Sequence, residues 1–231
     1  MQNDTSTTLK VATLVCPDVF MPDIIGGQTV FGMVPNTETY LVWKNLEQFN
    51  AMPNWPMCAT STFETCPNVD VLIVGATSPE VVSDPEVLAF VKQQAKHASI
   101  VIGICAGTLL LGAAGLLKDK KARTNFQMMD TLEELGAHPV VGQGVLIDGK
   151  FYTAGPVSGS YKAALLALAT LRGEEIAQIM ELTLEYDPKP PFGVGSPELA
   201  GKVLTEKTML LHKAWADAQK ENAKKAYCLL T

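Results

Sequence analysis

The chain alternates between short apolar runs rich in β-branched residues and longer segments in which apolar residues recur every three or four positions. The short runs are typical of buried strands, and the longer spacing is typical of amphipathic helices. Asp148-Gly149, between two apolar runs, is a strong signal for a two-residue hairpin turn. The pattern predicts strands at 9–15, 39–43, 70–74, 100–104, 140–147 and 151–153, and a short strand at 122–124.

The segment Glu86–His97 shows the helical pattern most clearly, because its apolar residues fall on one face. Asp84 suits the N-cap of this helix and Pro85 its first turn. Further helices are expected at 23–31, from Cys105 to about 117, at 128–135, at 161–171 with Ser158 as its cap, at 174–184 and at 199–226. Residues 44–69 are irregular, with a hairpin expected around 58–63, and 187–197 form a loop.

Strands that alternate with helices predict an α/β fold: a three-layer sandwich with a mostly parallel sheet and helices on both faces. We expect one domain over 1–231, with a polar tail at 1–8 and a C-terminal helix and tail at 199–231. Ligands of such folds bind beyond the carboxyl ends of the strands. This places the candidate site among 16–23, 75–79, Cys105 and 154–159.

The uncharged run from Ile100 to Leu117 contains the motif Gly103-Ile-Cys105-Ala-Gly107. This is the cysteine counterpart of the G-x-S-x-G nucleophile elbow, and the start of a helix favours a thiolate. We therefore expect a nucleophile at Cys105. The alternatives are a buried core thiol and a transmembrane helix. Four glycines and the change of residue type at Cys105 favour a strand followed by a helix.

Asp23 follows the first strand and is the carboxylate expected to reach Cys105 from a neighbouring loop. Burial beside an anion raises the pKa of a carboxyl group, which would suit Asp23 for general acid catalysis. The alternative is that Asp23 only caps its helix. No histidine is adjacent to Cys105, so a dyad of neighbouring Cys and His residues is excluded.

Two glycine-containing turns complete the candidate site. The backbone amides of Gly75 and Ala76, with that of Ala106, are candidates for an oxyanion site, although an ordinary turn at 75–76 is an equal alternative. Gly155 and Ser158 are expected in the pocket wall, where Ser158 is also a candidate helix cap.

Composition narrows the functional classes. The 231 residues carry a formal charge of −6 and have no clustered basic face, which argues against nucleic acid as a partner. The polar N-terminus lacks an apolar signal core, so we expect a cytoplasmic protein without a membrane partner. Five scattered cysteines without C-x-x-C, and three distant histidines, indicate neither a disulfide framework nor a metal site.

The chain resembles the ThiJ/PfpI superfamily, whose fold is similar to that of class I glutamine amidotransferases. Within it, the chain looks most like the isonitrile hydratases. The likeness is carried by 105–117, by Leu184-Glu-Tyr-Asp-Pro-Lys-Pro-Pro-Phe192 and by Gly195-Ser-Pro197. It implies a cofactor-free homodimer that converts a small isonitrile and water into an N-substituted formamide. Cys105 then takes the place of the nucleophile and Asp23 that of the acid, with a thioimidate as intermediate.

Several positions depart from the superfamily pattern. Ala106 stands where a threonine is usual, Ala76 where a glycine is usual, and Asn125 lies in a segment that lacks the usual histidine. Lys162 stands where relatives have an aspartate. These departures leave two alternatives open: a cysteine hydrolase of amides or thioesters, and a redox sensor in which Cys105 is oxidised.

Overall fold

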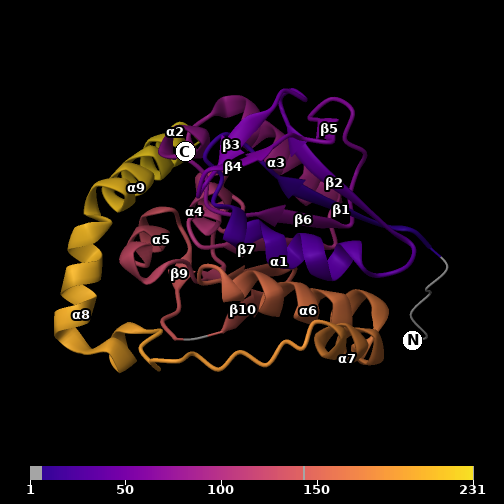
Figure 1. The fold of residues 1–231 in the computed structure, drawn as a ribbon. Coiled ribbons are helices and arrows are strands. Elements are labelled where there is room, and N and C mark those ends of the chain that lie inside the picture. The colour runs from indigo at the N-terminus through magenta and orange to yellow at the C-terminus, as the bar shows by residue number, and fades with distance from the viewer. Residues whose placement is uncertain (1–6, 143, 231) are drawn as a thin grey trace.

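A computed structural model describes residues 7–142 and 144–230, and 1–6 of the predicted tail lie outside these ranges. Its centre is a seven-stranded sheet in the order β10-β11-β7-β6-β1-β2-β5 (Figure 1). The strands are β1 (Leu9–Leu14), β2 (Thr37–Trp43), β5 (Ser61–Thr62), β6 (Val71–Val74), β7 (Ile100–Ile104), β10 (Val145–Asp148) and β11 (Phe151–Ala154). All neighbours are parallel except β10 and β11, which form the predicted hairpin.

The centre of the sheet is buried on both sides. Every residue of β6, β7 and β11 is buried, which explains why these strands appear in the sequence as continuous apolar runs rather than as alternating ones. Two small sheets lie outside it: β3 (Phe49–Ala51) pairs antiparallel with β4 (Trp55–Met57), and β8 (Lys121–Ala122) pairs parallel with β9 (His138–Pro139).

Helices form a layer on each side, as predicted. On one side α1 (Met21–Gly32), α6 (Ser158–Arg172) and α7 (Glu174–Thr183) pack together, and on the other α2 (Pro79–Val82), α3 (Pro85–His97), α4 (Gly107–Ala113) and α9 (Lys213–Cys228) form a second group. The chain steps from β1 outwards to β2 and from β6 the opposite way to β7. Right-handed crossovers therefore put α1 and α3 on opposite faces. The remaining helical segments are η1 (Phe126–Met128), α5 (Thr131–Glu134) and α8 (Pro197–Leu211).

The predicted long C-terminal helix is wrong as a single element. It is divided into α8 and α9 at His212, and Gly201 inside α8 has a φ of 72°. Figure 1 shows α8 as an arm along the outside of the molecule, continued by α9, which returns to pack on α2 and α4. No residue of α8 is buried, so its leucine spacing does not mark a face that packs on this chain.

Other boundaries shift for local reasons. The helix after Cys105 ends at Ala113, and Gly115, with a φ of 73°, lies just beyond its end. The helix expected at 128–135 is split into η1 and α5. The hairpin expected near 58–63 lies earlier, at 49–57, and β5 instead extends the main sheet in parallel. The strand expected from 140 begins at Val145.

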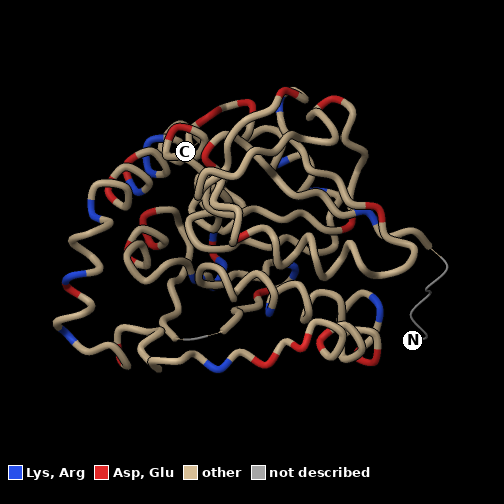
Figure 2. Tube along the Cα trace, viewed as in Figure 1, with Lys and Arg blue, Asp and Glu red and all other residues tan. Residues whose placement is uncertain are grey.

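Charges of both signs are interspersed along the outer helices, as Figure 2 shows for α9. Within the described residues, no helix has the length and apolar character needed to span a bilayer. The uncharged run that raised this possibility forms β7 and α4 instead.

Candidate active site

The turn between β7 and α4 is a sharp elbow with Cys105 at its tip, where φ is 55°. Such a positive φ is uncommon for a residue other than glycine and marks a strained turn. The flanking glycines are required by space. A Cβ on Gly107 would lie 2.2 Å from the carbonyl oxygen of Val74, and one on Gly103 would lie 2.7 Å from Cδ1 of Leu111. The elbow predicted from the sequence is therefore present.

Two segments hold the elbow cysteine in place. The Cys105 N–H donates to the carbonyl of Ala154 at the end of β11, at 2.9 Å. The Thr124 hydroxyl donates to the Cys105 carbonyl at 2.5 Å. The next residue, Asn125, directs its side-chain amide at the Cys105 sulfur, with 3.7 Å between Nδ2 and Sγ. The thiol, 3% exposed, is thus fixed in a buried position.

Asp23 lies in the first turn of α1 and is fully buried. The helix begins at Met21 after Phe20, and Asp23 makes no capping bond, so the alternative in which it only caps its helix is wrong. Its Oδ1 accepts from the Val157 N–H at 2.8 Å and its Oδ2 from the Ala76 N–H at 3.2 Å. These two amides come from the loops after β11 and β6, and Asp23 itself follows β1, so segments after three strands of the sheet jointly place the carboxyl group.

Asp23 and Cys105 form an interacting pair. Burial raises the pKa of Asp23 to about 6. Hydrogen bonds from the amides of Val157 and Ala76 and from the Cys105 thiol lower this pKa, but by less than burial raises it. Burial, together with the charge of Asp23, raises the pKa of the Cys105 thiol, although Asn125 and the amide of Ala106 stabilise the thiolate. The larger opposition to the thiolate favours the proton on sulfur and Asp23 as the carboxylate at neutral pH. This reverses the expectation that the helix start favours a resting thiolate.

The structure assigns the Ala76 amide a different role from the predicted one. That N–H is bonded to Asp23, so it does not face a substrate oxyanion. Gly75 provides room, since a Cβ there would lie 2.7 Å from Ile24 Cγ2 and 3.0 Å from the Asp23 Cβ. The amide of Ala106 does point at the sulfur.

The two residues predicted for the pocket wall, Ser158 and Gly155, differ in their exposure. Ser158 is the first residue of α6 and is exposed, and its side chain does not cap the helix, so that prediction is wrong. Its carbonyl accepts from the Tyr186 hydroxyl at 3.1 Å. The cap position belongs to Val157, with a φ of 57°. Gly155 is half-buried beside the elbow.

Sequence reasoning missed the contributions of Val157 and Thr124. Val157 donates its backbone N–H to Asp23, and Thr124 donates its hydroxyl to the Cys105 carbonyl. Each contact joins residues far apart in the chain, which no local motif reports. Asn125 was noticed only for the histidine that is absent from its segment, although its amide is the side-chain donor to the sulfur.

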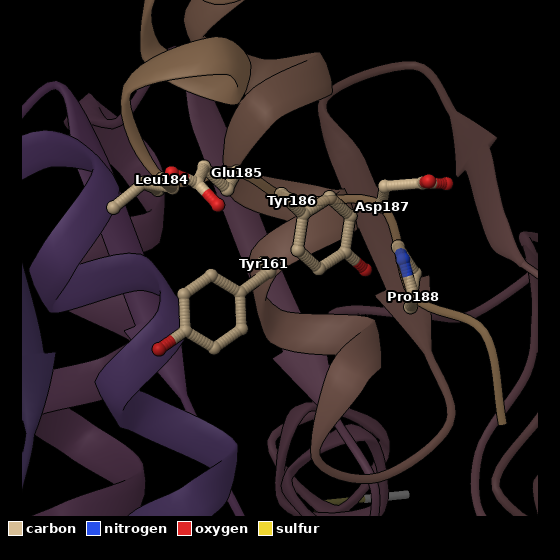
Figure 3. Close-up of a pocket in the computed structure, with 6 residues that line it drawn as sticks. All are labelled: Tyr161, Leu184, Glu185, Tyr186, Asp187 and Pro188. Atoms are coloured by element: carbon tan, nitrogen blue, oxygen red, sulfur yellow. The ribbon is translucent and has the colours of Figure 1, made fainter. Parts of the chain in front are cut away.

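A hollow of about 270 Å³ lies between α6 and the segment after α7. Figure 3 shows the ring of Tyr186 beside that of Tyr161, and the two stack with centroids 5.6 Å apart. Leu184, Glu185, Asp187 and Pro188 complete the lining. None of these residues belongs to the Cys105 site. Across the described residues, no three His, Cys, Asp or Glu side chains gather in a metal-binding arrangement.

A buried cysteine on a strand-to-helix elbow, paired with a carboxyl group from the first helix of an α/β sandwich, defines a class of cysteine-elbow proteins. The DJ-1/PfpI family model matches residues 35–170, and the chain belongs to this family. The isonitrile hydratase of Pseudomonas putida is 37% identical over 200 residues, which cover 86% of this chain and 87% of that protein.

Solved structures agree with this assignment. A ThiJ/PfpI family protein from Pseudomonas syringae superposes with a TM-score of 0.89 at 30% identity, covering 94% of this chain and 90% of the other. The DJ-1beta of Drosophila melanogaster shares the fold, with a TM-score of 0.71 at 16% identity, over 79% of this chain and all of that one. The predicted superfamily and fold class are thus confirmed.

Proposed function

We propose that the protein is a cysteine-dependent hydratase that adds water to a small isonitrile and releases an N-substituted formamide. The observation that carries the proposal is the buried pair of Asp23 and Cys105, which holds one exchangeable proton between a base and a nucleophile. The 37% identity to an isonitrile hydratase over most of both chains supports this choice of substrate.

In the first step, the Cys105 sulfur attacks the terminal carbon of the isonitrile while its proton passes to the carboxylate of Asp23. The carbon–sulfur bond forms from a sulfur electron pair as one C–N π bond opens onto nitrogen, and Asp23 then returns the proton to the lone pair of that same carbon. The product of this step is a thioimidate, R–N=CH–S–Cys105, and Asp23 is again a carboxylate. The amides of Asn125 and Ala106 stabilise charge on the sulfur during the transfer.

In the second step, Asp23 accepts a proton from water as the oxygen adds to the thioimidate carbon. Asp23 passes this proton to the nitrogen. The carbon–sulfur bond then breaks as the added hydroxyl becomes the formamide carbonyl, and the hydroxyl proton returns to the sulfur. The balance is one isonitrile and one water in, and one formamide out, with the enzyme unchanged. A carboxyl group with a pKa of about 6 suits this role, because it both accepts and returns a proton near neutral pH.

The two alternatives have less support. A hydrolase of amides or thioesters needs donors for an oxyanion, and the Ala76 amide is occupied by Asp23. A redox sensor needs an exposed thiolate, whereas Cys105 is 3% exposed and its thiol pKa is raised by burial.

We also propose that the chain acts as a single domain, in the cytoplasm, and as a homodimer. The exposed apolar residues of α8, which include Leu199, Val203, Leu210 and Leu211, support an assembly in which a second copy covers the arm. Sedimentation at micromolar concentration tests this, and a monomer contradicts it.

Incubation with cyclohexyl isonitrile, followed by quantification of the formamide, tests the reaction. We expect turnover by the wild type and none by Cys105→Ala. A matched control is Cys228→Ala, because Cys228 is an exposed free cysteine at the end of α9. The absence of formamide with folded wild-type protein, or full activity of Cys105→Ala, overturns the proposal.

A further inference from the structure

Two basic side chains from distant parts of the chain meet at Gly144. The Arg123 guanidinium donates from Nη1 to the Gly144 carbonyl at 2.8 Å. The Lys162 ammonium nitrogen, from α6, lies 3.3 Å from the point that a Cβ on Gly144 would occupy. Because the Cβ and carbonyl oxygen of one residue are about 3 Å apart, the two cations lie within about 9 Å of each other.

These cations are not neutralised by the protein. Over residues 7–142 and 144–230, no Asp or Glu oxygen lies within 4.0 Å of Arg123 or Lys162, whereas Lys44, Lys120, Lys220 and Lys224 each have such a partner. The Nε of Arg123 is buried without an acceptor. Burial lowers the pKa of Arg123, and no carboxylate opposes that effect. Lys162 is exposed, whereas Arg123 is half-buried. Charged groups withdrawn from water are ordinarily paired, so the Arg123 guanidinium lacks an anion.

Arg123 lies in the segment that holds the reactive thiol. Arg123 immediately precedes Thr124 and Asn125. Thr124 donates a hydrogen bond to the Cys105 carbonyl, and Asn125 donates one to the Cys105 sulfur. The backbone N–H of Arg123 itself is fixed to the Thr153 hydroxyl at 3.1 Å. The guanidinium therefore belongs to the same rigid shell as the nucleophile.

Gly155 is close to both the elbow and the guanidinium group. Gly155 follows Ala154, whose carbonyl accepts the Cys105 N–H. A Cβ on Gly155 would meet, among the described residues outside its chain neighbours, one atom within 4 Å: the Nη2 of Arg123, at 3.8 Å. The position over Gly155 therefore has room for a Cβ, and the Arg123 guanidinium borders it.

We propose that the substrate is an anionic isonitrile, whose organic group crosses Gly155 and ends in a carboxylate held by Arg123 and Lys162. This inference rests on the proposed hydratase function and names its substrate class. A carboxylate accepts a charge-assisted hydrogen bond from Nη2 and gains Coulomb attraction from the Lys162 ammonium. The arrangement assigns these residues to binding and leaves the bond-making steps to Cys105 and Asp23.

The test compares 4-isocyanobutanoate with its methyl ester, which has the same chain but no charge. We expect the wild type to have a kcat/KM at least about 10-fold higher for the acid, mainly through KM, since one charge-assisted contact is worth about that factor. Lys162→Met and Arg123→Gln reduce the acid-to-ester ratio towards one. Lys96→Met is the matched control, because it removes the same charge from an exposed position at the end of α3.

The outcomes separate the two proposals. If the wild type hydrates both isonitriles with equal kcat/KM and Lys162→Met does not change the ratio, the anionic subsite is wrong and the hydratase function stands. If neither isonitrile reacts, the hydratase function is wrong, and calorimetric titration with 4-formamidobutanoate decides the subsite. Binding that Lys162→Met weakens and Lys96→Met does not supports the subsite, and no binding to the wild type overturns it.

Discussion

The carboxyl group of Asp23 and the thiol of Cys105 interact directly in a buried site, although 82 positions separate them in the chain (105 − 23). Burial disfavours the charged form of each group, and two adjacent anions repel each other. A single proton shared by the pair removes this repulsion. The pair therefore acts as a unit, and its protonation state determines which group is the base at the start of the reaction.

The pH dependence of the reaction follows from this pair. Asp23 accepts the thiol proton only as a carboxylate, and its pKa is raised to about 6. We expect kcat/KM for isonitrile hydration to rise about 10-fold per pH unit below 6 and to level off above it. Initial rates of formamide formation between pH 4.5 and 8 measure this. A rate that falls as pH rises through 6 would mean that Asp23 must start protonated beside a thiolate.

The same group links stability to pH. Because the pKa of Asp23 is raised from 3.8 to about 6 on folding, the native state holds a proton that the unfolded chain has lost between these values. The stabilisation from this proton is complete below 3.8 and is lost as pH rises through 6, by up to about 3 kcal/mol. Urea unfolding at pH 4.5 and pH 7.5 measures the change.

Asp23→Asn is the control for this linkage, because it removes the titrating group and keeps the side-chain shape. The fall in unfolding free energy from pH 4.5 to 7.5 should be smaller in this variant than in the wild type. Equal pH dependence in the two proteins would show that the pKa of Asp23 is not raised on folding.

Much of this arrangement could be predicted from local sequence. The elbow has a motif because its geometry demands small residues at Gly103 and Gly107, and β7 is a continuous apolar run because both faces of the sheet are covered. Asp23 could be located because chain order places the end of β1 near the elbow. The elbow and β7 each depend on a few consecutive residues, and the place of Asp23 depends only on the order of the elements along the chain.

The rest depends on contacts between distant segments. The amide of Val157 bonds Asp23 across 134 positions, and no side-chain pattern encodes a backbone donor. Arg123 and Lys162 meet only because β10 brings Gly144 between them. The sequence predicts a C-terminal helix, yet no residue of α8 is buried against this chain, because the periodicity of a helix does not specify its partner.

The elbow glycine gives a prediction about stability. Gly107→Ala places a Cβ 2.2 Å from the Val74 carbonyl oxygen, a backbone atom that cannot move aside without distorting β6. We expect this substitution to destabilise the protein by about 3 kcal/mol or more, or to prevent folding. Thermal unfolding of the purified variant measures it. Gly195→Ala is the control, because a Cβ there meets no atom within 4 Å, and its melting temperature should stay within about 2 °C of the wild type. Equal melting temperatures for Gly107→Ala and wild type would contradict the geometry of the elbow.

The last prediction concerns the donor on the sulfur. Asn125 Nδ2 lies 3.7 Å from the Cys105 Sγ and lowers the thiol pKa against the larger effect of burial. Asn125→Leu removes this donor, so the thiol pKa should rise further and Cys105 should react more slowly with iodoacetamide, by about 10-fold at pH 8 for a one-unit shift. Mass spectrometry of the Cys105 peptide over time measures the rate. The exposed Cys58 provides an internal reference within the same sample, because its reactivity should not change. An unchanged Cys105 rate with an unchanged Cys58 rate would show that Asn125 does not stabilise the thiolate, and would leave the Ala106 amide as the donor that supports sulfur in the proposed reaction.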